Sequence, residues 1–393
     1  MSWVAKKIAD LGRVVTGKTP ATGNPEFFDG EYLFVTPSDI DYANYYCHQT
    51  ERTVTNSARE KHANQFVPKD AVMFTCIGNT IGKCAIALSD SLTNQQINSV
   101  VVNHHTDAKF AYYLLCNNVA SIRPLGGGSA TPIINKTDFE GIEFRVPPHD
   151  VQKQIGEFLS TYDDLIANNR RRMALLEESA RQLYREWFVR LRFPGHEHTR
   201  IIDGVPEGWE QKKLRDLCGE VRETVSPDSL EPDTPYIGLE HMPRRSISLN
   251  DWGRIEQVTS SKHRFRTGEI LFGKIRPYFH KVGVAFVDGV ASSDAIVIRP
   301  VEERLHGLVL MTVSSDEFVA VTSQTMKEGS KMPRADWKQM QAYSVPLPSS
   351  GVLCTFDGVI QTIIAQLKAL TFANQKLHAA RNLMLPRLMN GDL

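Results

Sequence analysis

Residues 69–87, KDAVMFTCIGNTIGKCAIA, have a second copy in the same chain. The stretch TGEILFGKIRPYFHKVGVA at 267–285 aligns with them without a gap, at a constant offset of 198 positions. In both copies apolar, β-forming residues flank a polar loop, which predicts two strands joined by a turn. Shorter matches continue on both sides, between Lys6–Leu11 and Lys212–Leu217 and between Ala180–Leu183 and Ala380–Leu383. Such a period is far longer than a solenoid repeat, so it indicates a duplicated domain.

The loop of the first copy, IGNTIGKC, has a partial likeness to a phosphate-binding P-loop. That motif needs four residues between its glycines and a hydroxyl residue after its lysine. Here three residues separate Gly78 from Gly82, and Cys84 follows Lys83. The second copy, IRPYFHKV, has no glycine, and of the P-loop residues it keeps only the lysine, Lys281. We therefore predict a tight turn that carries different side chains on a common scaffold, rather than a nucleotide site.

A long helical pattern follows each copy. Apolar residues alternate at spacings of four and three through 151–191 and again through 356–388, which is typical of a coiled-coil seam. The seams are Ile155, Leu159, Tyr162, Ile166, Asn169, Met173, Leu176, Ala180, Leu183 and Trp187, then Phe356, Ile360, Ile363, Leu367, Leu370, Asn374, Leu377, Arg381, Met384 and Leu388. Each contains one Asn, a residue that can fix register when buried. We predict that the helices pack together antiparallel, and that Pro386 disturbs the end of the second. The alternative is that each helix packs only on its own domain.

The expected fold class is therefore α+β. Two duplicated globular α/β domains are separated by two long antiparallel coiled-coil helices, with pseudo-twofold symmetry. The predicted parts are a first domain at 1–150, a central helix at 151–192, a linker at 193–208, a second domain at 209–349 and a C-terminal helix at 350–393.

Composition and motifs restrict the function. The 393 residues include 45 basic and 45 acidic side chains, so a uniformly cationic surface is excluded but local basic faces are not. Six cysteines without a C-x-x-C pair favour a reduced, cytoplasmic protein over a zinc or disulfide framework. With no signal peptide and no apolar run near the ~18 residues of a membrane span, we expect no membrane association. No catalytic motif is intact: Asn24–Phe27 approaches the N-P-P-F of amino-methyltransferases, but Glu26 breaks it.

Local charge suggests nucleic acid as the partner. Residues 243–281 hold nine Arg or Lys against three acids, interleaved with aromatic residues. Such side chains neutralise phosphates and, for Arg, bind guanine edges, whereas amides such as Asn79 and Gln95 in the first copy suit adenine edges. The alternative is an ordinary solvated face. Candidate DNA-binding residues are Lys18, Asn79, Lys83, Gln95, Ser129 and Lys136 in the first copy, and Lys274, Arg276, Tyr278, Lys281, Lys331 and Arg334 in the second. Lys83 and Lys281 share one position and are assigned to phosphate; Arg276 and Tyr278 are assigned to sequence readout.

Over essentially its whole length the sequence resembles the DNA-specificity subunit of type I restriction–modification systems. The resemblance is carried by TGKTPATGNPEFFDGEYLFVTPSDI at 16–40, TNQQINSV at 93–100, LMLPRLMNGDL at 383–393 and the helix entry with Gln152 and Ile155. One departure is Val151, which stands where the family has Glu before Gln.

The resemblance implies two target-recognition domains, each reading one half of a bipartite, asymmetric site on double-stranded DNA. It also implies that the helices dock two methyltransferase (M) subunits and that restriction/translocase (R) subunits complete the complex. This chain would then catalyse nothing and bind no cofactor, since S-adenosylmethionine, ATP and Mg²⁺ come with the partners. The alternatives are a specificity subunit of a type II-like enzyme whose partner both methylates and cuts, a stand-alone DNA methyltransferase, and a protein–protein adaptor without DNA contact.

Overall fold

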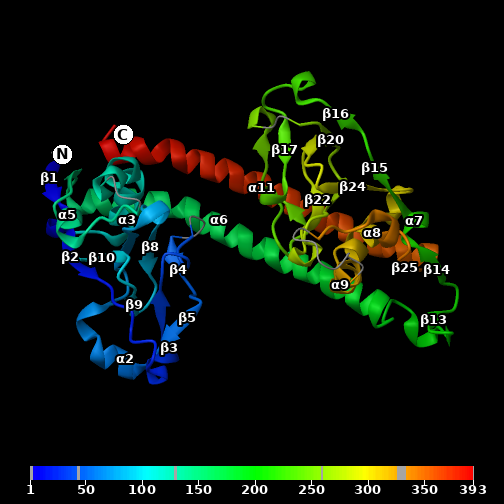
Figure 1. Cartoon of the computed structure of the whole chain (residues 1–393), viewed down its shortest axis with the longest axis horizontal. Helices are drawn as coiled ribbons and strands as arrows, with labels where there is room; N and C mark the ends of the chain where they lie inside the picture. The colour runs from blue at the N-terminus through cyan, green and yellow to red at the C-terminus, as the bar shows by residue number, and fades with distance from the viewer. Residues whose placement is uncertain (1–2, 42–44, 128–130, 258–259, 325–332, 393) are drawn as a thin grey trace. The chain divides into compact units, whose positions relative to one another are not determined.

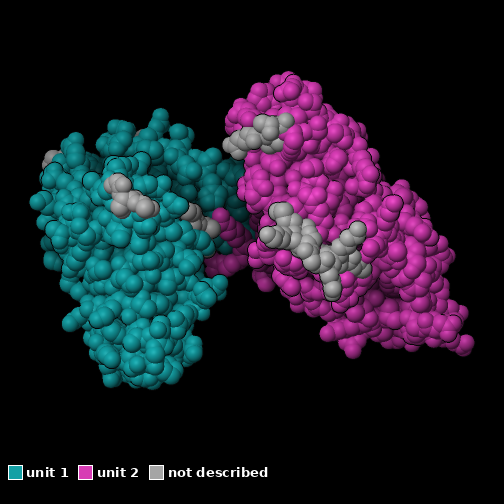
Figure 2. Space-filling view, viewed as in Figure 1, with its two compact units in different colours: residues 1–169, 374–393 teal, residues 170–373 magenta. Residues whose placement is uncertain are grey.

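The computed structural model describes residues 3–41, 45–127, 131–257, 260–324 and 333–392. The chain divides into two compact units (Figure 2): unit 1 comprises residues 1–169 and 374–393, and unit 2 comprises residues 170–373. Each unit contains one copy of the duplicated sequence. Both long helices, α6 (His149–Tyr184) and α11 (Ser350–Asn390), contribute residues to both units (Figure 1).

Each unit contains a five-stranded sheet with the same strand order. In unit 1 the order is β2 (Gly12–Thr16), β10 (Ile97–Val102), β7 (Val72–Thr75), β8 (Cys84–Ala87) and β4 (Tyr46–Cys47). In unit 2 it is β15 (Cys218–Val221), β24 (Ala295–Pro300), β21 (Ile270–Gly273), β22 (Val282–Ala285) and β18 (Ser248–Leu249). The last pair of each sheet is parallel and the other pairs are antiparallel. The predicted strand–turn–strand duplication is confirmed as the hairpins β7–β8 and β21–β22.

A second sheet is also shared. Unit 1 has β5 (Arg52–Val54), β3 (Phe28–Val35), β9 (Ser91–Thr93) and β6 (Phe66–Val67), in that order. Unit 2 has β16 (Thr224–Val225), β20 (Lys262–Phe265), β23 (Gly289–Ala291), β17 (Pro235–Ile237) and β19 (Gly253–Arg254). The parallel pair β3–β9 has its counterpart in β17–β23. Two-stranded sheets join β1 (Val4–Lys7) to β11 (Glu143–Val146), β14 (Glu210–Lys213) to β25 (Ser344–Leu347), and β12 (Ile201–Ile202) to β13 (Val205–Pro206).

Shorter helices complete each unit. Those of unit 1 are α1 (Ile8–Leu11), α2 (Asn56–Lys61), α3 (Ala108–Asn117), α4 (Val119–Ile122) and α5 (Lys136–Glu140). Those of unit 2 are α7 (Leu214–Leu217), α8 (His306–Val313), α9 (Asp316–Gln324) and α10 (Trp337–Met340). The structure is thus a mixture of helix and sheet with two long helices, as the predicted fold class requires.

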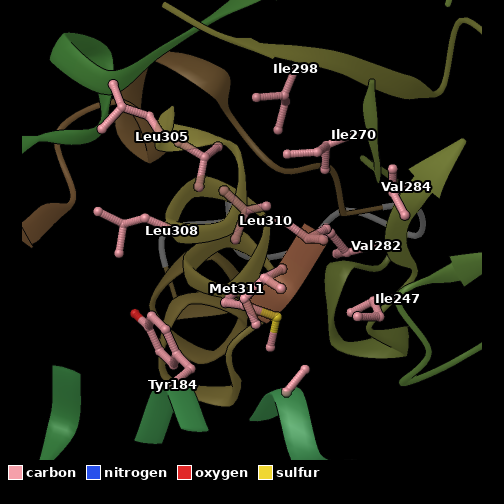
Figure 3. Packing of buried hydrophobic residues seen from close by; sticks show 14 of the residues in the cluster. Tyr184, Ile247, Ile270, Val282, Val284, Ile298, Leu305, Leu308, Leu310 and Met311 are labelled. Atoms are coloured by element: carbon pink, nitrogen blue, oxygen red, sulfur yellow. The ribbon is translucent and has the colours of Figure 1, made fainter. Parts of the chain in front are cut away.

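The five-stranded sheets are buried on both faces, since successive side chains of a strand point to opposite sides and each side packs in a different core. In β21, Ile270 and Phe272 lie in the core formed with α8 and α6, whereas Leu271 lies in the core formed with the second sheet. Figure 3 shows α8 in this position, with Leu310 and Met311 between the sheet and the long helix. The apolar sequence of α8 is explained by this burial on all sides.

The two long helices pack antiparallel in each unit. In unit 1, Asn169 Nδ2 donates to Asn374 Oδ1 at 2.9 Å, and further along the pair Arg381 contacts Asp163. Along the pair, residue numbers therefore fall on α6 while they rise on α11. In unit 2, the ring of Tyr184 at the end of α6 lies 6.5 Å from that of Phe356 near the start of α11. The predicted antiparallel pairing of the two helices is confirmed, and the structure adds that the two seam Asn residues bond to each other.

One expectation about α11 was wrong. Pro386 does not disturb the end of the helix, which continues to Asn390. Proline removes the bond to the carbonyl of residue 382, but Asn382 and Pro386 are both exposed, so water can satisfy that carbonyl. By length and composition alone, α11 is the one helix among the described residues that is apolar enough to cross a membrane. Much of its apolar surface, including Phe356, Ile360 and Leu367, is packed in the core of unit 2.

Candidate nucleic-acid interface

Three loops distant in sequence meet at one end of the five-stranded sheet of unit 1. Because β7 and β10 are antiparallel, the last residue of β7 and the first residue of β10 lie at the same end of the sheet. Backbone bonds then connect the loops: Cys76 N donates to Gln96 O at 2.8 Å, Gly78 N to Pro132 O at 2.8 Å and Ile134 N to Cys76 O at 2.9 Å. We call residues 76–82, 93–96 and 131–134 the first loop cluster.

Unit 2 repeats this arrangement with other residues. Lys274 N donates to Asp294 O at 2.7 Å, Arg276 N to Pro333 O at 2.9 Å and Ala335 N to Lys274 O at 2.9 Å. We call residues 274–280, 292–294 and 333–335 the second loop cluster. Each cluster also contains an isolated antiparallel bridge, Ile77–Ile133 in the first and Ile275–Arg334 in the second. The two clusters therefore share one backbone scaffold, as the sequence alignment predicts.

The structure brings several predicted residues of unit 1 together. Asn79 and Gln95 are exposed on the first loop cluster, and Gln95 Oε1 accepts a hydrogen bond from Thr19 Oγ1 at 2.7 Å. Lys18 is exposed beside them, since its backbone N donates to Thr93 O at 2.8 Å. Lys136 is the first residue of α5, with its ammonium 3.5 Å from Glu140. The predicted site residue Ser129 lies outside the described residues.

Unit 2 presents a different set of side chains. Arg276 and Tyr278 are exposed on the second loop cluster, and Arg334 Nη2 lies 3.2 Å from Asp294 Oδ1. Lys274 is partly buried: its Nζ donates to Ser293 O at 2.9 Å, and burial lowers the pKa of its ammonium. The fifth predicted residue of this region, Lys331, lies outside the described residues.

The two equivalent lysines have the same structural role. Lys83 Nζ donates to Pro37 O at 2.9 Å, and Lys281 Nζ donates to Leu239 O. Each bond ties the hairpin of the five-stranded sheet to the loop that follows β3 or β17. An ammonium has three donors, so a phosphate contact is compatible with this bond and stays a prediction.

Backbone conformation is also retained between the loops. Gly78 and Gly82 have φ of 55° and 99°, and the aligned Arg276 and His280 have φ of 49° and 53°. A non-glycine residue in this left-handed region costs about 1–2 kcal/mol. His280 is 6% exposed, its Nε2 donates to Ser314 O at 2.8 Å, and burial lowers the pKa of the imidazole. Arg276 instead points outward, with its guanidinium 5.8 Å from the ring of Phe279.

The basic stretch 243–281 is less cationic as a surface than its composition predicts. Arg245 lies 2.8 Å from Asp316, and Arg264 lies 3.1 Å from Glu223. Both acids are outside the stretch in sequence, which is why a count along the sequence misses them. Arg244 stacks on Phe279, with its guanidinium carbon 4.0 Å from the ring centroid.

Sequence reasoning did not select Ile133, although it occupies the bridge position of Arg334. Its side chain is 56% exposed on the first loop cluster. The signal was present in the sequence: aligning Pro132 with Pro333 places Ile133 on Arg334. In the sequence, however, two adjacent isoleucines are more readily interpreted as buried core residues than as a binding surface.

Among the described residues, no group of three or more His, Cys, Asp or Glu could hold a metal ion.

Comparison with known proteins shows which proteins this chain resembles. Residues 1–178 match the family model described as the type I restriction modification DNA specificity domain. The specificity subunit of the MjaIX type I restriction enzyme from Methanocaldococcus jannaschii is 23% identical over 100% of this chain and 93% of its own length. The chain is similar to type I restriction enzyme specificity subunits. This confirms the resemblance predicted from the sequence.

Two further known proteins are also similar to this chain. The EcoDI specificity subunit of Escherichia coli is 23% identical over 61% of this chain and 59% of its own length. The crystal structure of the type I restriction-modification S subunit from M. genitalium superposes with a TM-score of 0.61 at 15% identity, covering 99% of this chain and 96% of that one. At that identity the likeness shows a common fold.

Proposed function

We propose that this chain is the sequence-specific DNA-binding specificity subunit of a type I restriction–modification complex. Each loop cluster binds one half of a bipartite, asymmetric site on double-stranded DNA. The observation that carries the proposal is the pair of loop clusters, which share backbone bonds, bridge position and left-handed residues but present different side chains. One scaffold with two different polar surfaces is suited to reading two different sequences.

The chemistry of the two surfaces differs. The first cluster presents the amides of Asn79 and Gln95, which pair with the donor and acceptor of an adenine edge. The second presents Arg276 and Arg334, whose guanidinium groups match the two acceptors of guanine. Exposed lysines such as Lys18 contact phosphate and supply affinity without sequence preference.

The long helices dock two methyltransferase subunits, and restriction/translocase subunits join the complex. On α6, Phe158 and Leu165 of unit 1 and Leu175 of unit 2 are large apolar side chains left exposed, as a docking surface requires. The partners supply S-adenosylmethionine, ATP and Mg²⁺, and this chain supplies recognition.

Methylome sequencing tests the proposal in a host that carries this gene with its partner genes. We expect methylated bases within a bipartite motif of two unlike halves, and the motif should disappear when this gene is deleted. A methylation pattern that is independent of this chain would contradict the proposal. Ultraviolet crosslinking of labelled S-adenosylmethionine to the isolated chain separates it from a stand-alone methyltransferase, and we expect no labelling.

A further inference from the structure

Ile133 and Arg334 occupy one position in the duplicated scaffold. Each belongs to the isolated bridge of its loop cluster: Ile133 pairs with Ile77, and Arg334 pairs with Ile275. The backbone around Ile133 is held by two hydrogen bonds. Ile133 N donates to Gly126 O at 3.0 Å, and the next amide, Ile134 N, donates to Cys76 O at 2.9 Å. Its side chain is therefore presented outward by a fixed backbone while its neighbour Ile134 is buried.

An isoleucine that is 56% exposed among amide side chains has a specific chemical use at a DNA interface. Thymine is the base that carries an apolar group, its 5-methyl, in the major groove, and apolar side chains contact it there. Asn79 and Gln95 on the same loop cluster suit the adenine partner of a thymine. We infer that Ile133 and Arg334 are equivalent specificity-determining positions, and that Ile133 contacts the methyl group of a thymine in one half-site while Arg334 binds a guanine in the other. This inference rests on the proposed function.

The contact between Arg334 and Asp294 supports the second half of the assignment. Its Nη2–Oδ1 distance is 3.2 Å, and both side chains are solvent-accessible. An exposed ion pair adds little to stability, so its main effect is to restrict the orientation of the guanidinium. Asp294 is fixed in turn, since its backbone O accepts from Lys274 N at 2.7 Å and its backbone N donates to Ser292 Oγ at 3.2 Å. Asp294 is thus a positioning residue for Arg334.

The experiment begins with the full chain in complex with its methyltransferase subunits and a library of duplexes with random sequence. The wild-type complex selects two half-sites. Each thymine of the selected site is then replaced by uracil, which lacks only the 5-methyl group. One replacement should weaken binding about fourfold, because burial of one methyl is worth about 0.8 kcal/mol. In the Ile133→Ala complex the same replacement should have no further effect.

A matched control is Leu88→Ala. Leu88 is also an exposed apolar residue of unit 1, at 40% exposure, but it follows β8 at the end away from the hairpin loop. This variant should respond to uracil as the wild type does. In unit 2, Arg334→Ala should lose preference at one guanine by about tenfold or more, and Asp294→Ala should lose part of it. Arg334→Lys should not restore the preference, since an ammonium cannot make the bidentate contact.

The outcomes separate the inference from its premise. If every uracil replacement affects the wild-type and Ile133→Ala complexes equally, the methyl contact is wrong, although the proposed function stands. If Arg334→Ala weakens binding to all duplexes alike, Arg334 holds phosphate and the equivalence of the two positions is wrong. If the wild-type complex selects no sequence, the proposed function itself is overturned.

Discussion

The loop at 77–83 in unit 1 and the loop at 275–281 in unit 2 follow the same backbone path with almost no sequence in common. Two positions in each have positive φ, occupied by Gly78 and Gly82 in one loop and by Arg276 and His280 in the other. Both loops donate an equivalent bond to a proline carbonyl. The surrounding loops therefore impose this path. Glycine adopts it without a side-chain clash, and Arg or His adopts it at a cost.

The neighbours of Gly82 and of the aligned His280 explain why unit 1 has glycine at this position and unit 2 has histidine. A Cβ at Gly82 would lie 2.2 Å from Val119 Cγ1 of α4, so no larger residue fits there. In unit 2 the imidazole of His280 instead packs by α9 and bonds to Ser314 O. The two hairpins are therefore alike in backbone and unlike in what each packs against.

The largest effect should come from exchanging these residues. Gly82→His forces a side chain into Val119 and strains the backbone, so we expect a loss of about 3 kcal/mol in the stability of unit 1. Hydrogen exchange of the β7–β8 segment, measured by mass spectrometry, reports this loss. The reverse exchange, His280→Gly, serves as the control and should cost far less in unit 2. Equal protection in wild type and Gly82→His would show that the Val119 contact relaxes freely.

The next effect concerns the other positive-φ residue. Arg276→Ala should cost about 1–3 kcal/mol on the cognate DNA site and relax one position of the second half-site. The first half-site, bound by residues around Asn79 and Gln95, should be unchanged. Binding to a panel of singly substituted duplexes, with the methyltransferase subunits present, measures this. An equal loss on every duplex, non-specific DNA included, would mean that Arg276 only grips the phosphate backbone.

The shared lysines should give equal, smaller effects in the two units. Lys83→Met and Lys281→Met each remove one bond to a backbone carbonyl, worth about 1 kcal/mol of stability in the corresponding unit. If each also contacts phosphate, the slope of log affinity against log salt should fall by about one. Salt titrations of the two variants test this. A slope equal to that of the wild type would leave both lysines with the structural role alone.

The smallest effect is the contribution of one histidine of unit 2, His280, to the pH dependence of stability. Burial lowers the pKa of His280 below its ordinary value of about 6.5. Its stabilising contribution is therefore complete above about pH 6.5 and is lost as the pH falls toward the lowered pKa, because the unfolded chain binds the proton more readily. Asp316 opposes this shift, and Arg245 and Arg181 add to it. Denaturation at pH 7.5 and 5.5 should show a smaller decrease for His280→Gly than for the wild type. Identical decreases would assign the dependence to other histidines, such as His263.

The sequence alone was enough to predict the duplication, the strand–turn–strand hairpins and the antiparallel pairing of the two long helices. These follow from local periodicity and from one constant offset, which need no knowledge of distant contacts. Only the tertiary structure decided the partners of Lys83 and Lys281, the pairing of Arg245 and Arg264 with acids outside the basic stretch, and the outward position of Ile133. It also decided that α11 continues through Pro386. In each case the deciding neighbour or solvent exposure is set by how distant segments pack, and pattern along the chain does not contain that information.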